Sequence, residues 1–215
     1  MQLSEAGTGR RAGVYNRWLK RPFDLGVMLA AHVVLLPVWA AAWTAIPLAI
    51  WLWDRGPVFY RQERVGRGGR TFAVYKFRTM APDADRTGPD KTARNDPRIT
   101  PVGRVLRRTA LDELPQTLSI WVGHMSLVGP RPLSAAEFRG LEAEVPGLSM
   151  RLAVRPGLTG LAQVFDPADD PRKKLELDLE YISRVSLVLD LRLLFLSVLN
   201  TVSARWDSRA GRGSR

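Results

Sequence analysis

A long apolar stretch dominates the hydrophobic pattern of the chain. No residue from Leu25 to Trp53 carries a formal charge, and His32 is the one titratable residue among them. About 20 apolar residues are enough for a helix to span the hydrocarbon core of a bilayer. A helical hairpin buried inside a soluble protein is the alternative, but ordinary buried helices are shorter than this stretch. The pattern therefore favours insertion of residues 23–53 into a membrane.

The flanks of this stretch indicate how it enters the membrane. Basic residues both precede and follow it, and cytoplasmic segments next to membrane helices are enriched in lysine and arginine. A helix that crossed the membrane once would place one of these two basic clusters on the non-cytoplasmic side. Pro37 lies near the middle and breaks the helix there, so the sequence predicts a re-entrant helix hairpin that returns to the face it entered. The flanking basic residues are Arg10, Arg11, Arg17, Lys20 and Arg21 upstream and Arg55, Arg61, Arg64, Arg67 and Arg70 downstream.

An alternating pattern replaces the apolar run after Asp54. Apolar and polar side chains alternate on both sides of the Gly-rich turn GRGGR, which predicts a short β-hairpin. Lys76 and Arg78 are expected just past its second strand. The polar residues 81–101, rich in Pro, Gly and Asp, are typical of a loop. A helix is predicted over residues 102–108.

Helical spacing returns in the C-terminal half of the chain. One helix is predicted to end near Val145, and the segment RPGLTGLAQV is predicted to contain a short strand. Over residues 172–206 apolar residues recur at helical spacing with basic residues between them. This pattern predicts an amphipathic helix that covers the core or lies along a membrane surface. The fold class is therefore α+β and mostly helical.

Net charge narrows the choice of partners. The chain has 32 Lys and Arg against 21 Asp and Glu, and its formal charge of +11 attracts nucleic acid, anionic lipid headgroups or phosphorylated substrates. No nucleic acid is expected as a partner, because of the apolar stretch and because no stripe of aromatic residues alternates with basic ones to stack bases. The chain has no cysteine, which excludes disulfides and thiolate metal sites.

The decapeptide RRTALDELPQ, residues 107–116, places two acidic residues next to a basic run. Nearby cations favour the ionised forms of Asp112 and Glu113. An ionised carboxylate can ligate Mg²⁺, which often bridges to substrate phosphates, or attack phosphorus as a nucleophile and form an acyl phosphate. An acidic pair on a helix surface with solvated arginine neighbours is the alternative. Basic side chains that could neutralise phosphate oxygens are Lys76, Arg78, Arg107, Arg108 and Arg131.

Several phrases occur in a specific order along the chain: KRPFDL, GPVFYRQERVG, KFRTM, DPRITPVGRVLRRTALDELPQ, MSLVGPRPL and RPGLTGLAQV. From about Trp18 to about Trp206, their order and spacing resemble those of the bacterial sugar transferase family, the monotopic phosphoglycosyl transferases. The resemblance implies transfer of a sugar 1-phosphate from a UDP-sugar to undecaprenyl phosphate, with release of UMP, as the first membrane step of glycan assembly. It also implies Mg²⁺ as the cofactor and a covalent phospho-sugar enzyme.

The resemblance also assigns roles to single residues. Asp112 matches the nucleophilic aspartate of the family, and Glu113 matches its metal-binding glutamate. Arg155 and Gln163 fall in a segment on the nucleotide side, and Pro37 matches the proline that breaks the re-entrant helix. Basic residues of the KFR, LR and GPRP motifs would hold substrate phosphates, namely Lys76, Arg78, Arg107 and Arg131.

Pattern and resemblance together divide the chain into four segments. Residues 1–22 form a basic N-terminal segment, and residues 23–53 form the re-entrant membrane helix. Residues 54–206 form a small catalytic domain with interfacial helices, and residues 207–215 form a disordered basic tail. The expected location is the bacterial inner membrane, with monotopic attachment and the catalytic domain on the cytoplasmic face. Several apolar helix faces could pair two copies in a homodimer.

Three places depart from the family pattern. Leu36 stands where a serine often precedes the breaking proline, so no hydroxyl satisfies a freed backbone group there. His124 stands where an acid is usual, in GHMS instead of GDMS, which changes the local charge by one unit; a structural contact that tolerates histidine is the alternative. The Gly-Arg-Asn run expected after GLAQV is replaced by FDPADD, residues 165–170. A catalytically weak or inactive membrane scaffold with the same fold is therefore the alternative to an enzyme.

Overall fold

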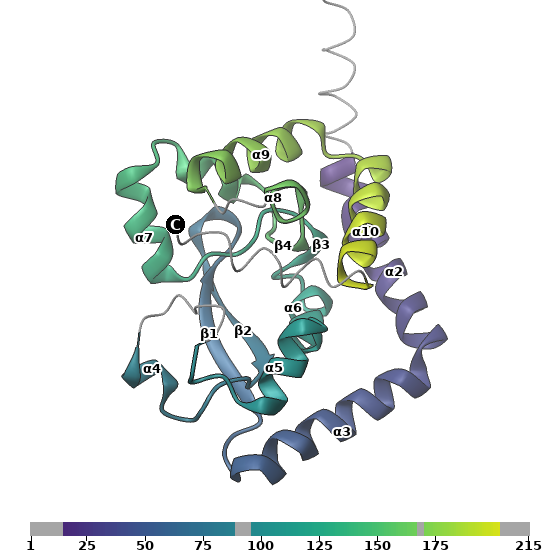
Figure 1. The fold of residues 1–215 in the computed structure, drawn as a ribbon. Coiled ribbons are helices and arrows are strands. Elements are labelled where there is room, and N and C mark those ends of the chain that lie inside the picture. Colours follow the sequence, from purple (N-terminus) through teal and green to yellow (C-terminus); the bar gives the residue numbers. More distant parts are fainter. Residues whose placement is uncertain (1–14, 89–95, 167–169, 203–215) are drawn as a thin grey trace, which may run out of the picture.

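The computed structural model describes residues 15–88, 96–166 and 170–202. After a turn of π-helix, η1 (Tyr15–Leu19), the chain forms helices α2 (Lys20–Val34) and α3 (Leu36–Asp54). Figure 1 shows these two helices as an open elbow, which follows one side of the body and then runs beneath it. Most of the predicted basic N-terminal segment and the whole predicted basic tail lie outside the described residues.

The elbow between α2 and α3 lies at Leu35. Pro37 is in the first turn of α3, where its missing N–H leaves no hydrogen bond unmade. Trp39 supports the bend, because its ring stacks on His32 with centroids 4.2 Å apart. Its indole N–H also donates to the carbonyl oxygen of Ala31 over 3.3 Å. The bend therefore has support that does not need a serine hydroxyl.

One face of α3 packs against the body and the other is open. Ile46 and Ile50 are buried, and the ring of Trp43 lies 5.4 Å from the ring of Phe77. In the described part of the chain, α3 is the one helix long and apolar enough to cross a membrane, by length and composition alone. Exposed apolar side chains of the elbow are Leu29, Val33, Val34, Leu36, Val38, Leu48 and Leu52.

The predicted β-hairpin is confirmed. Strand β1 (Phe59–Val65) pairs antiparallel with β2 (Thr71–Phe77) across the short 3₁₀ turn η2 (Arg67–Gly69). Two glycines of this connection have φ values of 67° and 79°, a backbone region that favours glycine. Lys76 belongs to β2, where it pairs with Tyr60, so the strand is longer than predicted. The first residue after the strand is Arg78.

The segment after the hairpin is only partly a loop. A short helix, α4 (Ala84–Thr87), interrupts the predicted loop; it has too few residues to show apolar periodicity in the sequence. Residues 89–95 lie outside the described part of the chain. The next helix, α5 (Pro101–Arg108), agrees with the prediction, and the Thr100 hydroxyl caps it by accepting a hydrogen bond from the N–H of Gly103 over 2.9 Å.

A second small sheet contains the predicted strand of the RPGLTGLAQV segment. This strand, β4 (Gly157–Thr159), pairs in parallel with β3 (Ser126–Val128). Two helices come between these strands in the sequence. They are α7 (Ala135–Glu144), which ends where predicted, and the 3₁₀-helix η4 (Leu148–Ala153). Helix α8 (Leu161–Phe165) follows β4 directly.

The C-terminal amphipathic region forms two helices rather than the single helix predicted. Helices α9 (Pro171–Arg184) and α10 (Leu187–Val202) are separated at Ser186, whose hydroxyl accepts from the N–H of Leu189 over 3.3 Å. Tyr181 and Leu193 of these helices pack in the main core. Figure 1 shows α9 across the top of the body and α10 alongside the upper part of α2.

A buried anchor, formed by Lys20, Asp24 and Asp190, joins the first turns of α2 to α10. Lys20 Nζ lies 2.7 Å from Asp190 Oδ2 and 3.3 Å from Asp24 Oδ1, and none of the three side chains is more than 6% exposed. The hydroxyls of Tyr15 and Tyr181 donate to Asp190 over 2.7 and 2.8 Å. The start of the predicted membrane helix is therefore part of the core of the body.

Candidate active site

The acidic pair lies on η3 (Leu111–Gln116), a short 3₁₀-helix that follows α5 and packs along β2. The chain changes direction before it at Ala110, whose φ of 55° lies in the left-handed region that favours glycine. Such strain persists where the surrounding structure fixes the backbone, and it is often found next to functional residues. Pro115 inside η3 lacks an N–H and disfavours a regular α-helix here. Asp112 and Glu113 are thereby held beside the hairpin.

Glu113 is at the centre of the charged groups. Its Oε1 accepts a hydrogen bond from Lys76 Nζ over 2.6 Å and lies 3.7 Å from the guanidinium of Arg131. Burial raises the pKa of Glu113, but attraction to Lys76 and Arg131 and hydrogen bonds from Lys76 and Gln116 outweigh burial and lower it. Glu113 is therefore firmly ionised at neutral pH.

The pKa of the neighbouring Asp112 is shifted the other way. Burial raises it most, and the charge of Glu113 adds to this, while Lys76 and Arg107 lower it without cancelling the rise. No side chain among the described residues forms a hydrogen bond with the Asp112 carboxyl group. The pair thus combines one fixed anion with one carboxylate that is poorly solvated and weakly held. Environments that push two carboxyl pKa values apart are typical of acids with different chemical roles.

Arg107 reaches the pair from the last turn of α5. Its Nε–H donates to the Thr79 hydroxyl over 2.8 Å, just beyond the end of β2. Burial lowers the pKa of Arg107, and the attraction of Asp112 partly offsets this. An arginine remains protonated in such a site, and its four other N–H groups are suited to phosphate oxygens.

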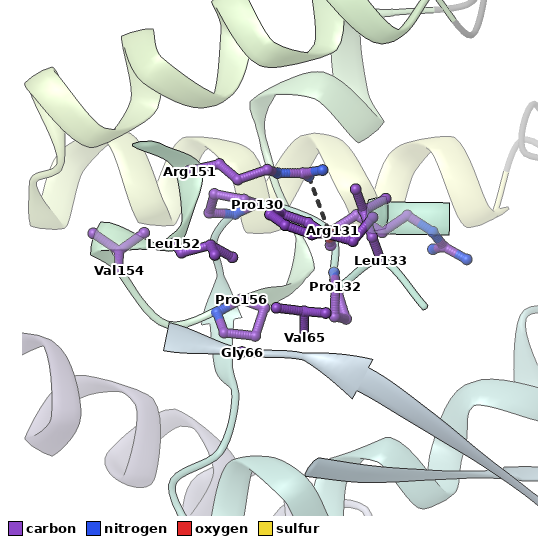
Figure 2. A pocket seen from close by; sticks show the side chains of 11 residues that line it. Val65, Gly66, Pro130, Arg131, Pro132, Leu133, Arg151, Leu152, Val154 and Pro156 are labelled. Atoms are coloured by element: carbon purple, nitrogen blue, oxygen red, sulfur yellow. Dashed lines mark hydrogen bonds between the residues drawn. The ribbon is translucent and has the colours of Figure 1, made fainter. Parts of the chain in front are cut away.

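Arg131 approaches the acidic pair from another part of the chain, the Gly-Pro-Arg-Pro turn. Figure 2 shows this turn above β1, with the Arg151 guanidinium donating to the backbone carbonyl of Arg131 over 2.9 Å. Arg64 holds the next residue by donating to the Pro132 carbonyl over 2.8 Å. The Arg131 side chain is 44% exposed, so its charge is available to a substrate. We name Lys76, Arg107, Asp112, Glu113 and Arg131 the carboxylate cluster.

The structure places four predicted site residues away from this cluster. Arg78 is buried and pairs with Asp54 at the end of α3. The Nε–H of Arg155 donates to the Gly123 carbonyl over 2.9 Å. Gln163 lies in α8, and Pro37 lies at the elbow. Of the basic residues predicted to hold phosphates, Lys76, Arg107 and Arg131 are therefore the three that reach the acidic pair.

Supporting residues of the cluster were not identified from the sequence. Gln116 hydrogen-bonds Glu113, and its position three residues later on a 3₁₀-helix is a local signal for such a contact. Thr79, Arg64 and Arg151 orient the basic side chain or backbone next to the acids. These three contacts join residues distant in sequence, and no local pattern indicates them.

The donor set fits one mode of Mg²⁺ binding. Among the described residues there is no group of three or more His, Cys, Asp or Glu side chains that could form a complete protein cage. Mg²⁺ instead commonly uses one or two carboxylates together with phosphate oxygens of a substrate. Glu113 is an ionised carboxylate, and the Asp112 carboxyl group beside it has no side-chain hydrogen-bond partner among the described residues. The chemistry of Glu113 and Asp112 is thus suited to a metal shared with a diphosphate.

The departures from the family pattern lie outside the cluster. His124 is exposed, and its ring lies 5.5 Å from that of Phe72. In the replaced segment, Phe165 is exposed at the end of α8, and residues 167–169 lie outside the described residues. Asp170 caps α9 by accepting from the N–H of Arg172 over 2.9 Å. None of these described residues contacts the acidic pair.

Comparison with known proteins assigns the chain to a family. The model of the bacterial sugar transferase family matches residues 15–204. The exopolysaccharide production protein PSS of Rhizobium leguminosarum bv. phaseoli is 42% identical over 195 residues, which cover 86% of this chain and 96% of that protein.

Two longer relatives carry the name of a reaction. The UDP-glucose:undecaprenyl-phosphate glucose-1-phosphate transferase of Escherichia coli (strain K12) is 40% identical over 191 residues, which cover 85% of this chain and 40% of that protein. The UDP-N-acetylgalactosamine-undecaprenyl-phosphate N-acetylgalactosaminephosphotransferase of Aeromonas hydrophila is 38% identical over 177 residues, 80% of this chain and 42% of that protein. The chain thus spans less than half the length of these two relatives. The extent of these matches shows that the chain belongs to the bacterial sugar transferase family.

Proposed function

We propose that this protein transfers a sugar 1-phosphate from a UDP-sugar to undecaprenyl phosphate and releases UMP, the first membrane step of glycan assembly. The observation that carries the proposal is the carboxylate cluster, in which a weakly held carboxylate and an ion-paired carboxylate lie among three cations. The reactions named for the two longer relatives support the same reaction class. The sugar is left open because those relatives differ in it.

The reaction takes place in two steps at Asp112. First, a carboxylate oxygen of Asp112 attacks the β-phosphorus of the UDP-sugar. The bond from that phosphorus to the oxygen bridging the two phosphates breaks, and its electron pair leaves with UMP. An acyl phosphate that carries the sugar remains on Asp112. Second, an oxygen of undecaprenyl phosphate attacks the same phosphorus, the acyl phosphate bond breaks, and Asp112 is released as a carboxylate.

The cations of the cluster stabilise negative charge during both steps. Positioned positive charge is the main contribution of a protein to phosphoryl transfer. Arg107 and Arg131 approach the acids from different elements, so they can hold phosphate oxygens on two sides. Lys76 is already held by Glu113, which fixes the ammonium group close to the nucleophile. The proposal thus gives every member of the cluster a role.

We infer that Mg²⁺ is the cofactor and that Glu113, with Asp112 beside it, provides the protein ligand. When bound, the ion would neutralise part of the diphosphate charge. Glu113 suits this role because its lowered pKa keeps it ionised and free of a proton.

We also propose that the elbow is a re-entrant membrane helix in the bacterial inner membrane, with the catalytic residues 54–206 on the cytoplasmic face. The exposed apolar faces of α2 and α3 and the basic residues on both flanks support this topology. Helix α10 carries further exposed apolar side chains that can lie at the interface or pair two copies in a homodimer. These side chains are Leu187, Val188, Leu191, Phe195, Val198 and Leu199.

The experiment that tests the activity is UMP release by detergent-purified protein with Mg²⁺, across a panel of UDP-sugars, with and without undecaprenyl phosphate. Turnover that depends on the lipid, with one preferred sugar, is the expected result. Without lipid we expect a burst of UMP no larger than the amount of enzyme. Folded protein that releases no UMP with any sugar would favour the inactive scaffold instead.

The absence of cysteine from the chain allows a direct test of the topology. Single cysteines introduced as Arg17→Cys and Arg55→Cys would report the two flanks of the elbow. Both should react with a membrane-impermeant maleimide only after cells are permeabilised. Reaction of one of them in intact cells would show that the elbow spans the membrane.

A further inference from the structure

A second group of arginines gathers outside the carboxylate cluster, at residues 120–124. These residues comprise the end of helix α6 (Thr117–Trp121) and the turn that follows it, and we call them the turn at residues 120–124. Arg21 of α2 donates to the carbonyls of Ile120 and Trp121, the latter over 2.8 Å. Arg155 donates from its Nε–H to the carbonyl of Gly123 over 2.9 Å. Two guanidinium groups that are far apart in the sequence are therefore fixed on one turn.

The tip of the β-hairpin brings a third arginine to the same turn. Phe72 of β2 lies 5.5 Å from the ring of His124, measured between ring centroids. The same phenyl ring packs under Gly66, where an added Cβ would meet it at 3.0 Å. Arg67 follows Gly66 directly and is exposed. The hairpin tip and the turn at residues 120–124 are thus packed together through Phe72.

The surroundings of Arg67 and Arg155 indicate that the two residues are close to each other. Gly66 and Pro156, each adjacent in sequence to one of these arginines, line one pocket and are labelled together in Figure 2. Burial lowers the pKa of Arg155 most, and repulsion by Arg67 and then by Arg21 lowers it further. The positive charges of Arg67 and Arg21 therefore both act on Arg155.

These charges have no acidic partner within the described part of the chain. None of the three arginines (Arg21, Arg67 and Arg155) forms an ion pair with a described Asp or Glu. The carboxylate that acts on Arg155, Asp24, already binds Lys20 and the Ser126 hydroxyl. A guanidinium has five N–H groups, and the Nε–H is the one that Arg155 uses on Gly123. The site therefore has both surplus charge and free donors.

The position of this site separates it from the carboxylate cluster and places it beside apolar surface. Thr71, next to the hairpin tip, and Lys76, in the carboxylate cluster, are five residues apart on β2, which corresponds to about 17 Å along a strand. Val122 in the turn and Leu118 just before it are 67% and 50% exposed. An anion bound by the arginines would therefore lie near side chains suited to the membrane interface.

We propose that Arg21, Arg67 and Arg155 form an anion site that binds a phosphate group, that of an anionic lipid headgroup at the membrane surface. Guanidinium groups match phosphate oxygens in geometry and retain their charge when partly buried. Free phosphate offers the same chemistry, and the experiment separates the two sources. The proposal does not depend on the transferase activity, because its measurement is binding.

The experiment follows the thermal unfolding midpoint of the full chain in a neutral detergent. The probes are dihexanoyl phosphatidylglycerol, dihexanoyl phosphatidylcholine and inorganic phosphate, each titrated separately. The variants are Arg67→Gln and Arg155→Gln, with His124→Asp to add a carboxylate beside intact arginines. Arg139→Gln, an exposed arginine on α7, removes the same charge elsewhere and is the matched control.

We expect saturable stabilisation by phosphatidylglycerol but not by phosphatidylcholine. The apparent affinity should fall about tenfold in each of the three site variants and remain unchanged in Arg139→Gln. If inorganic phosphate, but not phosphatidylglycerol, stabilises the protein and loses affinity in the same three variants, the anion site binds a soluble phosphate rather than a lipid headgroup. Equal responses of wild type and Arg67→Gln, or an equal loss in Arg139→Gln, would overturn the proposal. Because Arg67 is exposed, its replacement does not endanger folding.

Discussion

The carboxylate cluster and the buried anchor are built from the same residue types, yet they differ in how their charges are satisfied. Each combines two acids with one lysine, but Lys20 is at ion-pair distance from both acids of the buried anchor, whereas Lys76 is at that distance from Glu113 alone among the described acids. In the buried anchor the lysine and both acids are at most 6% exposed. Every carboxylate oxygen there has a donor, from Lys20, Tyr15, Tyr181, Ser126 or the N–H of Leu127.

The carboxylate cluster is more open and less complete. Lys76 and Glu113 are 20% and 18% exposed, and no side-chain donor among the described residues holds Asp112. Arg107 and Arg131 add positive charge beyond what the two acids neutralise. A fully satisfied ionic group fixes one arrangement of the chain, whereas an incomplete group leaves charge for a substrate. We therefore assign a structural role to the buried anchor and a chemical role to the carboxylate cluster.

The largest expected effect is the loss of activity in Asp112→Asn. An amide has no negative charge and is a poor nucleophile, so UMP release should fall at least about a thousandfold. The stability of the folded protein, by contrast, should rise slightly. The pKa of Asp112 is raised in the folded protein, so its ionised form costs folding free energy above that pKa, and the amide removes this cost. We expect the variant to unfold at a slightly higher temperature than wild type at pH 8. A variant that is both inactive and strongly destabilised would contradict the view that the carboxylate cluster serves chemistry rather than stability.

Asp190→Asn, in the buried anchor, should lower stability and leave activity largely unchanged. It leaves Lys20 buried with one acid fewer, and breaking a buried ion pair typically costs about 3 kcal/mol or more. We expect a marked fall in the free energy of unfolding, measured with urea. At a temperature where the variant is folded, UMP release per folded molecule should stay close to that of wild type. Loss of activity in fully folded protein would show that the anchor also takes part in the chemistry.

A smaller effect is expected for Arg131→Gln. Removing one charged donor to a phosphate should lower kcat/KM by about ten- to a hundredfold while leaving the fold intact, because Arg131 is half exposed. Arg139→Gln provides the control for a change in net charge. If both variants lose activity equally, general attraction of the anionic donor explains the effect better than a specific contact does.

The smallest effect concerns pH. In the proposed reaction Asp112 attacks as a carboxylate, so activity should be lost as the pH falls through the pKa of Asp112. That pKa is raised by burial above the ordinary value of an aspartate. Lys76→Ala removes an attraction that lowers this pKa, so the acid limb of the pH profile should move to higher pH. An acid limb at the ordinary aspartate value, unchanged in Lys76→Ala, would show that Asp112 is more solvated than the structure indicates.

The sequence predicts most of what is local in this fold. The hairpin, α5 and the end of α7 follow from alternation, capping and helical spacing within each segment. Asp112 and Glu113 are adjacent in the chain, so their pairing needed no knowledge of the fold. The break between α9 and α10 was missed, although Ser186 is a helix-start signal inside the apolar repeat.

Contacts between distant residues could not be predicted in this way. Tyr15 and Asp190 are separated by 175 positions, and Asp24 and Ser126 by 102, and no periodicity relates them. Arg78 illustrates the same limit within the site. It lies two residues from Lys76, a spacing that would place both side chains on one face of a continuing strand, but β2 ends at Phe77 and Arg78 pairs with Asp54 rather than the acidic pair. Which basic residues meet an acid depends on the packing of whole elements.

The most direct test of the account is the intact mass of the protein after exposure to its UDP-sugar without undecaprenyl phosphate. The account predicts a mass increase equal to one sugar phosphate on wild type, its removal when the lipid phosphate is added, and no increase on Asp112→Asn. The same adduct on Asp112→Asn would contradict the assignment of the nucleophile.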